Sequence, residues 1–163
     1  MLNNTRPTAS KLLPGLLLSF SLSALLSLSC LAASPDFLER ENLEPALSQA
    51  KAAIEHHEWS VAGPLLDKLL QKNPDNSDLY TLSAFVCRKS GDLKCAFTKY
   101  RRALEINPGN LKALEYLGEA HLQNGDPKSA KIQLDLIEKF SSKQNEEWKD
   151  LNEDIQTYLS KKK

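Results

Sequence analysis

Apolar residues recur at steps of three and four positions through much of the chain, which is typical of amphipathic helices. Residues 93–104 show the pattern best, and the apolar positions there are Leu93, Ala96, Tyr100, Ala103 and Leu104. Asp92 and Asp126 precede two such segments, where a short acidic side chain can cap the first turn. Pro127 then stands at a first helical position, where its missing N–H costs nothing. The pattern predicts helices joined by short turns.

The helical pattern repeats with an offset of 34 residues. Matched positions along the three copies are Ala62, Ala96 and Ala130; Leu66, Tyr100 and Leu134; Leu69, Ala103 and Ile137; Ala50, Ala84 and Gly118; and the pair Pro74 and Pro108. The turn pairs Gly91-Asp92 and Gly125-Asp126 obey the same offset, with His57-Glu58 in the first copy. The small residues predict close helix–helix approach, and about three copies are needed to bury the apolar faces.

The repeat predicts the organisation of the chain. Residues 1–32 are expected to be a signal peptide, 33–42 a lead-in of undetermined structure, and 43–76, 77–110 and 111–144 the three repeats. Residues 145–163 are expected to form a capping helix with a basic tail. The apolar face of that helix is predicted to consist of Trp148, Leu151, Ile155 and Leu159.

Two positions depart from the repeat pattern. Gly63-Pro64 falls inside the second helix of the first copy, where proline removes a backbone hydrogen bond, so that helix is expected to start late or to bend. His57 replaces the turn glycine of the other copies, which predicts a different turn geometry there. Ser142, where a closing proline is expected, suits a junction into the capping helix.

The repeat resembles the tetratricopeptide repeat, a helix-turn-helix unit with small residues where its helices touch and a closing proline. The second copy carries the resemblance in Gly91-Asp92-Leu93, Ala96, Tyr100, Ala103-Leu104 and Asn107-Pro108. The resemblance implies an all-α solenoid of three helical pairs with a C-terminal capping helix. It also implies a non-catalytic adaptor or scaffold that binds a protein or peptide partner.

Partners of this family usually lie along the concave face made by the first helix of each pair. Carried onto this sequence, that face consists of Glu44, Leu47, Lys51, Ile54, Asp78, Thr81, Phe85, Arg88, Lys89, Lys112, Glu115, Glu119 and Leu122. The candidate partner-binding residues are Lys51, Phe85, Arg88, Lys89, Lys112, Glu115 and Glu119. The four cations could hold an acidic segment or a C-terminal carboxylate, with Phe85 as an apolar anchor.

Other interpretations of this face stay open. The lysine–asparagine carboxylate clamp of chaperone-binding members is not matched, because Leu47, Thr81 and Glu115 stand at its positions. The face could also be an ordinary solvated surface. Self-association through Phe85, Leu122 or the capping helix is a further possibility.

The first 32 residues have the layout of a signal peptide. Arg6 and Lys11 precede an apolar run, and Cys30-Leu31-Ala32 predicts cleavage between Ala32 and Ala33. Alternatives are a lipoprotein signal ending at Cys30 and an uncleaved membrane anchor. Each alternative exports the folded part. Resemblance to short exported proteins of this family suggests the periplasm or cell envelope of a bacterium, with membrane attachment only through the leader.

The charge balance argues against a nucleic-acid partner. The 163 residues contain 21 basic and 21 acidic residues, and no long Lys/Arg cluster occurs apart from the last three residues. Since two bases lie in the leader, the remaining chain carries about −2. A charged fraction of 26% with 41% hydrophobic residues is typical of a folded domain rather than a disordered one.

Cys87 and Cys95 flank the predicted turn of the second repeat. Antiparallel helices bring such positions to similar heights, so a disulfide is plausible in an exported protein. Two free thiols remain an alternative, and so, with less support, does a thiol-redox pair, because the spacing is wider than C-x-x-C.

No enzyme, cofactor or metal site is predicted. The histidines His56, His57 and His121 have no partner at metal-ligand spacing, and no phosphate-binding glycine loop or nucleophile motif occurs.

Overall fold

The computed structural model describes the backbone of residues 35–162 and the side chains of residues 43–162. This part of the chain is entirely α-helical and contains no strand. Its helices are α1 (Pro35–Glu55), α2 (Trp59–Lys72), α3 (Ser77–Lys89), α4 (Leu93–Ile106), α5 (Leu111–Gln123), α6 (Pro127–Phe140) and α7 (Glu146–Ser160). The predicted all-α class is confirmed. The predicted signal peptide, including Cys30, Ala32 and Ala33, lies outside the described residues.

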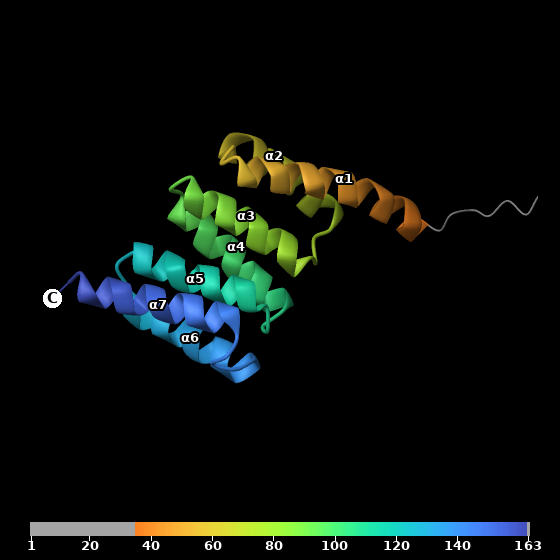
Figure 1. Cartoon of the computed structure of the whole chain (residues 1–163). Helices are drawn as coiled ribbons and strands as arrows, with labels where there is room; N and C mark the ends of the chain where they lie inside the picture. The colour runs from red at the N-terminus through yellow and green to blue at the C-terminus, as the bar shows by residue number, and fades with distance from the viewer. Residues whose placement is uncertain (1–34, 163) are drawn as a thin grey trace, which may run out of the picture. The chain divides into compact units, whose positions relative to one another are not determined.

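The helices form three antiparallel pairs, α1–α2, α3–α4 and α5–α6, and α7 packs on α5 and α6 (Figure 1). The second helices begin at Trp59, Leu93 and Pro127, so their start positions repeat every 34 residues. The predicted solenoid of three helical pairs and a capping helix is confirmed. Residues 36–41, whose structure the sequence did not determine, belong to α1.

The turns inside the three pairs share one geometry. His57, Gly91 and Gly125 have φ values of 62°, 90° and 82°, all in the left-handed region. In each turn the following backbone N–H bonds to a carbonyl five residues earlier, as in Glu58 to Ala53. The different turn geometry predicted for the first copy is therefore wrong. Histidine adopts the glycine conformation there, and its ring lies at hydrogen-bond distance from the Glu55 carbonyl.

Pro64 does not delay the start of α2. The helix begins at Trp59 in register with its counterparts, so the predicted late start is wrong. Proline leaves the Ser60 carbonyl without its usual intrahelical donor. Both Ser60 and Pro64 are exposed, so water can bond that carbonyl.

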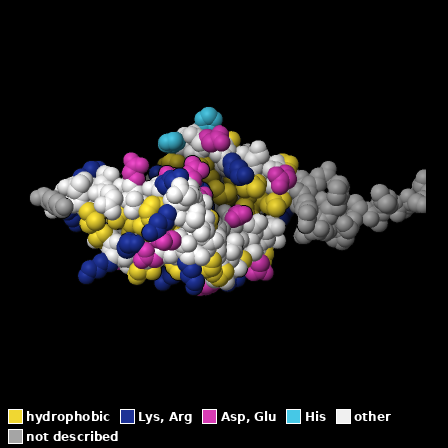
Figure 2. All heavy atoms as spheres, turned by 60° about the horizontal axis from the view of Figure 1, so that its bottom comes forward, with side chains coloured by type: hydrophobic (Ala, Val, Ile, Leu, Met, Phe, Trp, Pro, Cys, Tyr) yellow, Lys and Arg dark blue, Asp and Glu magenta, His cyan; other side chains and the backbone are white. Residues whose placement is uncertain are grey.

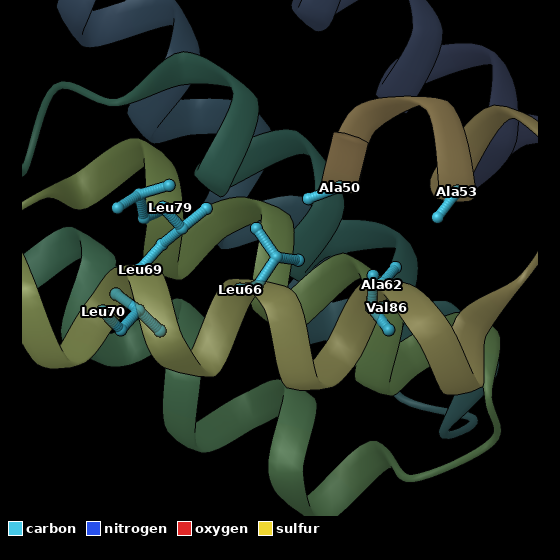
Figure 3. Packing of buried hydrophobic residues seen from close by; sticks show 8 residues of the cluster. All are labelled: Ala50, Ala53, Ala62, Leu66, Leu69, Leu70, Leu79 and Val86. Atoms are coloured by element: carbon cyan, nitrogen blue, oxygen red, sulfur yellow. The ribbon is translucent and has the colours of Figure 1, made fainter. Parts of the chain in front are cut away.

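The core consists of three connected clusters, one at each level of the stack. The first cluster joins α1, α2 and α3, and the eight side chains in Figure 3 are its buried members: Ala50, Ala53, Ala62, Leu66, Leu69, Leu70, Leu79 and Val86. Ala84, Ala96 and Tyr100 anchor the middle cluster. Alanines on α1 and α2 allow these helices to approach closely, while leucines fill the space toward α3.

Asn110 ties successive repeats together through a buried polar network. Its side-chain oxygen caps α5 by accepting from the Ala113 N–H at 3.0 Å. Its Nδ2 lies 2.8 Å from Ser77 Oγ and 3.0 Å from Asp78 Oδ1 at the start of α3. Ser77 Oγ in turn donates to the Ala103 carbonyl of α4 at 2.9 Å. One residue thus connects three helices of two repeats.

The residue types on the outward sides of the first and last helices explain why the described stack ends after three pairs. At matched positions α3 and α5 bury Leu79, Ser83, Val86, Ala113, Leu117 and Ala120, whereas α1 exposes Pro45, Gln49 and Ala52. At the other end, α7 buries Leu151 and Ile155 against α5 and α6. Leu159 is 43% exposed, so its predicted place on the buried face is wrong; Tyr158 packs against that cluster instead.

No helix within residues 35–162 is both long and apolar enough to cross a membrane.

Candidate functional site

The first helices of the pairs, together with α7, present one continuous face, called the A face below. It contains the thirteen positions predicted from the repeat register and, from α7, Glu147, Asp150 and Asp154. Ion pairs join its helices, since Arg88 of α3 contacts Glu119 of α5 and Lys112 of α5 contacts Glu147 of α7. In the view of Figure 2, Lys/Arg and Asp/Glu side chains intermix with hydrophobic ones over the surface.

Arg88 is an internal structural cation. Only 6% of the residue is exposed, and its Nη2 lies 2.7 Å from Glu119 Oε2. Its guanidinium also lies 5.4 Å from the centre of the Phe85 ring and 5.6 Å from that of Tyr116. The charges of Arg88 and Glu119 therefore neutralise each other, and a partner-binding role for either residue stays a prediction.

Lys112 is also paired within the chain. Its ammonium lies 2.9 Å from Glu115 and 3.4 Å from Glu147. Glu115 is only 4% exposed, and this burial raises the pKa of its carboxyl to about 7, although Lys112 opposes the shift. Burial disfavours the charge of Lys112 too, but contact with Glu115 raises its pKa above the usual value. Lys112 therefore connects α5 to the capping helix.

An aromatic row crosses the A face. The rings of Trp59 and Phe85 lie 6.2 Å apart between centroids, and those of Phe85 and Tyr116 lie 5.0 Å apart. All three side chains are half-buried. The sequence predicted Phe85 as a binding residue but not Trp59 or Tyr116. Tyr116 directly follows Glu115, a predicted position of this face, and that neighbourhood was a usable signal. Lys89 remains exposed, with its ammonium 5.3 Å from the Phe85 ring centre.

Several carboxylates lie on the A face where α5 meets α7. Burial raises the pKa of Glu119, and the nearby charge of Asp154 raises it further; Asp150 acts in the same direction on Glu115. The sequence missed these α7 residues because the capping helix lies outside the repeat register. Thr81 and Leu122, two positions predicted on the exposed face, are buried. Of the four cations predicted on this face, only Lys51 and Lys89 are exposed and have no ion pair among the described residues, so a basic groove has fewer free charges than the sequence suggested and stays a prediction.

A cleft of about 310 Å³ lies where α3, α5 and α7 come together near their C-terminal ends. Its lining residues are Arg88, Glu119, Leu122, Gln123, Asp154, Thr157, Tyr158 and Lys161. Three donor atoms in this lining lack a hydrogen bond of good geometry among residues 43–162, namely Arg88 Nε, Arg88 Nη2 and the Tyr158 hydroxyl, although Arg88 Nη2 still lies 2.7 Å from Glu119 as an ion pair. The cleft thus offers donors and carboxylates side by side.

Cys87 and Cys95 lie on either side of the turn between α3 and α4. Their sulfur atoms are 2.07 Å apart and their Cα atoms 5.8 Å apart, which is the spacing of a bonded pair. Asp92, between them, caps α4 by accepting from the Cys95 N–H at 2.9 Å. The turn brings the two cysteines together as predicted.

The histidines lie apart from the A face cleft. His56 and His57 are exposed at the first turn, while His121 packs against Phe97 with ring centres 4.9 Å apart. Burial lowers the pKa of His121, and Asp126 partly opposes the shift. In the described part of the chain no three His, Cys, Asp or Glu side chains are arranged to hold a metal ion.

Comparison with known proteins agrees with this architecture. The family model of the tetratricopeptide repeat matches residues 88–155. Residues 88–155 therefore carry tetratricopeptide repeats. No curated protein matches it by sequence. The repeat family and fold place it with protein-interaction scaffolds and adaptors.

Solved tetratricopeptide-repeat structures share the fold at low sequence identity. The Sgt2 domain of Aspergillus fumigatus is 22% identical with a TM-score of 0.65, covering 73% of this chain and 80% of that one. Yersinia enterocolitica SycD, in complex with a peptide of the translocator YopD, is 18% identical with a TM-score of 0.64, covering 74% and 91%. MamA of Desulfovibrio magneticus RS-1 is 15% identical with a TM-score of 0.57. That match covers 60% of this chain, which spans only 55% of the MamA chain.

Proposed function

We propose that this tetratricopeptide-repeat protein is an exported, non-catalytic adaptor whose A face holds a peptide segment of a partner protein. The observation that carries the proposal is the half-buried aromatic row of Trp59, Phe85 and Tyr116 beside the cleft between α3, α5 and α7. A binding surface needs apolar anchors and a few unsatisfied polar groups, and this face has both. SycD, which shares the fold, is seen with a bound peptide.

Binding is proposed to be non-covalent and preorganised. Ion pairs between Arg88 and Glu119 and between Lys112 and Glu147 hold the A face across three helices. The face therefore loses little conformational entropy when a partner binds.

The compartment is inferred from the leader. A basic start, an apolar run and small residues before Ala33 favour cleavage by a signal peptidase and release into the periplasm or cell envelope of a bacterium. An oxidising compartment would keep Cys87 and Cys95 bridged. The mass of the N-terminus after expression of the full chain tests this inference. A chain beginning at Ala33 supports it, whereas a lipidated Cys30 would make the protein a membrane-tethered assembly factor, and an intact Met1 in the cytoplasm would contradict export.

The A face is tested by site-specific photo-crosslinking in cells. A photoreactive residue at Lys89 lies beside Phe85 on the A face, while one at exposed Lys131 on α6 provides a matched control. The proposal predicts a protein adduct from position 89 that position 131 does not give. An adduct from position 131 alone would move the binding surface to the second helices of the pairs, α2, α4 and α6.

A further inference from the structure

We propose that the first repeat carries a second partner site, a cleft between α1 and α2 that takes an aromatic side chain of a partner protein. Carboxylates of the same partner segment are bound by Lys68 and Lys72 at this cleft. The described residues that line it include none of the A face, so the proposal goes beyond the proposed function and does not depend on it.

The cleft has a volume of about 390 Å³ and lies where α1 passes the C-terminal end of α2. Its apolar wall consists of Leu43, Ala46, Leu65 and Leu69, and Lys68 and Lys72 are among its polar residues. Leu43, Ala46 and Leu65 are only half-buried, so part of this apolar wall stays open to solvent. The volume falls within the range of pockets that bind ligand groups.

The cleft is open because the first repeat has a small residue where the other two repeats have a large one. Ala46 occupies the repeat position of Tyr80 and Leu114. Tyr80 packs against the first core cluster, and Leu114 is 1% exposed within the cluster that joins α5, α6 and α7. The alanine leaves the corresponding space in the first repeat without partner atoms. A side chain that enters from another molecule therefore gains packing contacts there.

The second repeat shows which groups suit this position. The Arg102 guanidinium lies 6.0 Å from the centre of the Tyr80 ring, and its Nη2 lies 3.4 Å from Asp75 Oδ1. Lys68 occupies the repeat position of Arg102, and the ring beside it is missing because Ala46 replaces Tyr80. An aromatic ring and a carboxylate supplied by a partner would reproduce contacts that this chain already makes internally.

The charges at the cleft favour an acidic segment over a basic one. Lys68 and Lys72 are exposed and form no ion pair among residues 43–162. The described part of the lining contains no carboxylate. Of the acids nearby, Glu44 lines a separate hollow on α1, and Asp75 is already paired with Arg102. Aspartate or glutamate beside the aromatic residue therefore complements the two lysines.

The test uses the full chain as purified from the expressing cell and three short, end-blocked peptides of glycine and serine. The first peptide carries one tyrosine between two aspartates. The second has alanine in place of the tyrosine, and the third has lysine in place of each aspartate. Isothermal titration calorimetry is expected to show the first peptide binding at least about tenfold more tightly than either of the others, with an affinity that falls as salt is added. No binding of the first peptide, or equal affinity for an altered one, would overturn the proposal.

Filling the cleft locates the site. Ala46→Tyr restores the large residue of the other repeats and is expected to weaken binding of the first peptide at least about tenfold. Its urea midpoint should not fall, which separates a filled cleft from a damaged fold. The matched control, Ala52→Tyr, adds the same ring at an exposed position of α1 outside the cleft and should leave the affinity unchanged. Equal affinities of the two variants would overturn the assigned site.

Removing the two lysines tests the site without changing its apolar wall. Lys68→Ser with Lys72→Ser is expected to weaken the first peptide about tenfold. Lys94→Ser with Lys128→Ser removes two exposed cations elsewhere and should have no effect; equal losses in the two pairs would contradict the site.

The cleft and the A face are expected to act separately. Ala46→Tyr should therefore leave the cellular crosslink from position 89 unchanged, and a joint loss of peptide binding and crosslink would overturn a second, separate site.

Discussion

Arg88 on α3 and Glu119 on α5 form a largely buried ion pair with 2.7 Å between Nη2 and Oε2. Breaking one partner of such a pair leaves a desolvated charge, so Arg88→Met is expected to destabilise the protein by about 3 kcal/mol. Replacing both, Arg88→Met with Glu119→Leu, should recover part of that loss. Urea unfolding followed by circular dichroism gives the values.

Arg102→Met is the control for this prediction. Arg102 forms exposed pairs with Asp75 and Glu105 at 3.4 and 3.3 Å, which should contribute less than about 1 kcal/mol. Equal losses at Arg88 and Arg102 would contradict the structural role of the buried pair.

Asn110 and Asn76 occupy the same repeat position but make different contacts. Both cap a helix, while only Asn110 also reaches Ser77 and Asp78 of the preceding repeat. Asn76→Ala should cost about 1 kcal/mol, the usual value for a cap. Asn110→Ala should cost roughly 1–2 kcal/mol more, because it also removes buried hydrogen bonds. Thermal unfolding of the two variants side by side checks the difference, and equal losses would rule out the inter-repeat role.

Gly118 is the contact point of the capping helix. A Cβ atom built there would lie 2.5 Å from Leu151 Cδ2, and Leu151 is fully buried. Gly118→Ala is therefore expected to destabilise the protein by about 1–3 kcal/mol and to loosen α7. Hydrogen exchange of α7 amides reports that loosening directly.

Gly63→Ala serves as the steric control, because the nearest atom to a Cβ there is Val86 at 3.9 Å, an ordinary contact. That variant should gain about 0.5–1 kcal/mol from helix propensity. A stable Gly118→Ala variant with an unchanged exchange pattern would show that α7 does not pack as described.

Ionisation of Glu115 should make stability depend on pH. The pKa of Glu115 is raised to about 7 in the folded protein, above its usual value of 4.5, so folding favours the protonated form. Stability from this group is fully present below about pH 4.5 and is lost as the pH rises toward 7. His121 has the opposite trend, since its lowered pKa favours the neutral form.

The variant Glu115→Gln separates the contribution of Glu115 from that of His121. Its stability relative to the wild-type protein should rise between pH 5 and 8 by on the order of 1–3 kcal/mol. Urea midpoints measured across this range test the difference, and a pH-independent difference would show that Glu115 does not titrate there.

A disulfide between Cys87 and Cys95 closes a short loop with a sequence separation of 8. The chain-entropy account gives it about 2.5 kcal/mol of stabilisation. Dithiothreitol should therefore lower the urea midpoint of the wild-type protein and leave that of the Cys87→Ala, Cys95→Ala variant unchanged. Titration of two free thiols in the untreated, exported protein would contradict the bridge.

The fold follows from local and periodic signals, and therefore the sequence predicts it well. Helix starts at Leu93 and Pro127, caps at Asp92 and Asp126, and the buried faces of the three pairs all depend on residues a few positions apart. The 34-residue period then sets how the pairs stack. His57 was misjudged because the flanking helices impose the left-handed turn more strongly than the residue type opposes it.

The candidate site was less predictable because its properties depend on contacts between repeats. From the sequence, Arg88 is expected to be an exposed cation. Only the packing of α3 on α5 shows that Glu119 neutralises its charge. Asp150 and Asp154 reach the A face through α7, which does not follow the repeat register. The register places the first-helix residues on one face, whereas the ion pairs between them required the structure.

The most direct test of a partner site on the A face is an amide chemical-shift map of the ¹⁵N-labelled chain titrated with the partner protein that the crosslink at position 89 captures. The account predicts shifts concentrated in the C-terminal halves of α3, α5 and α7, around Arg88, Glu119 and Asp154. Shifts concentrated on α4 and α6, with these residues unchanged, would contradict it.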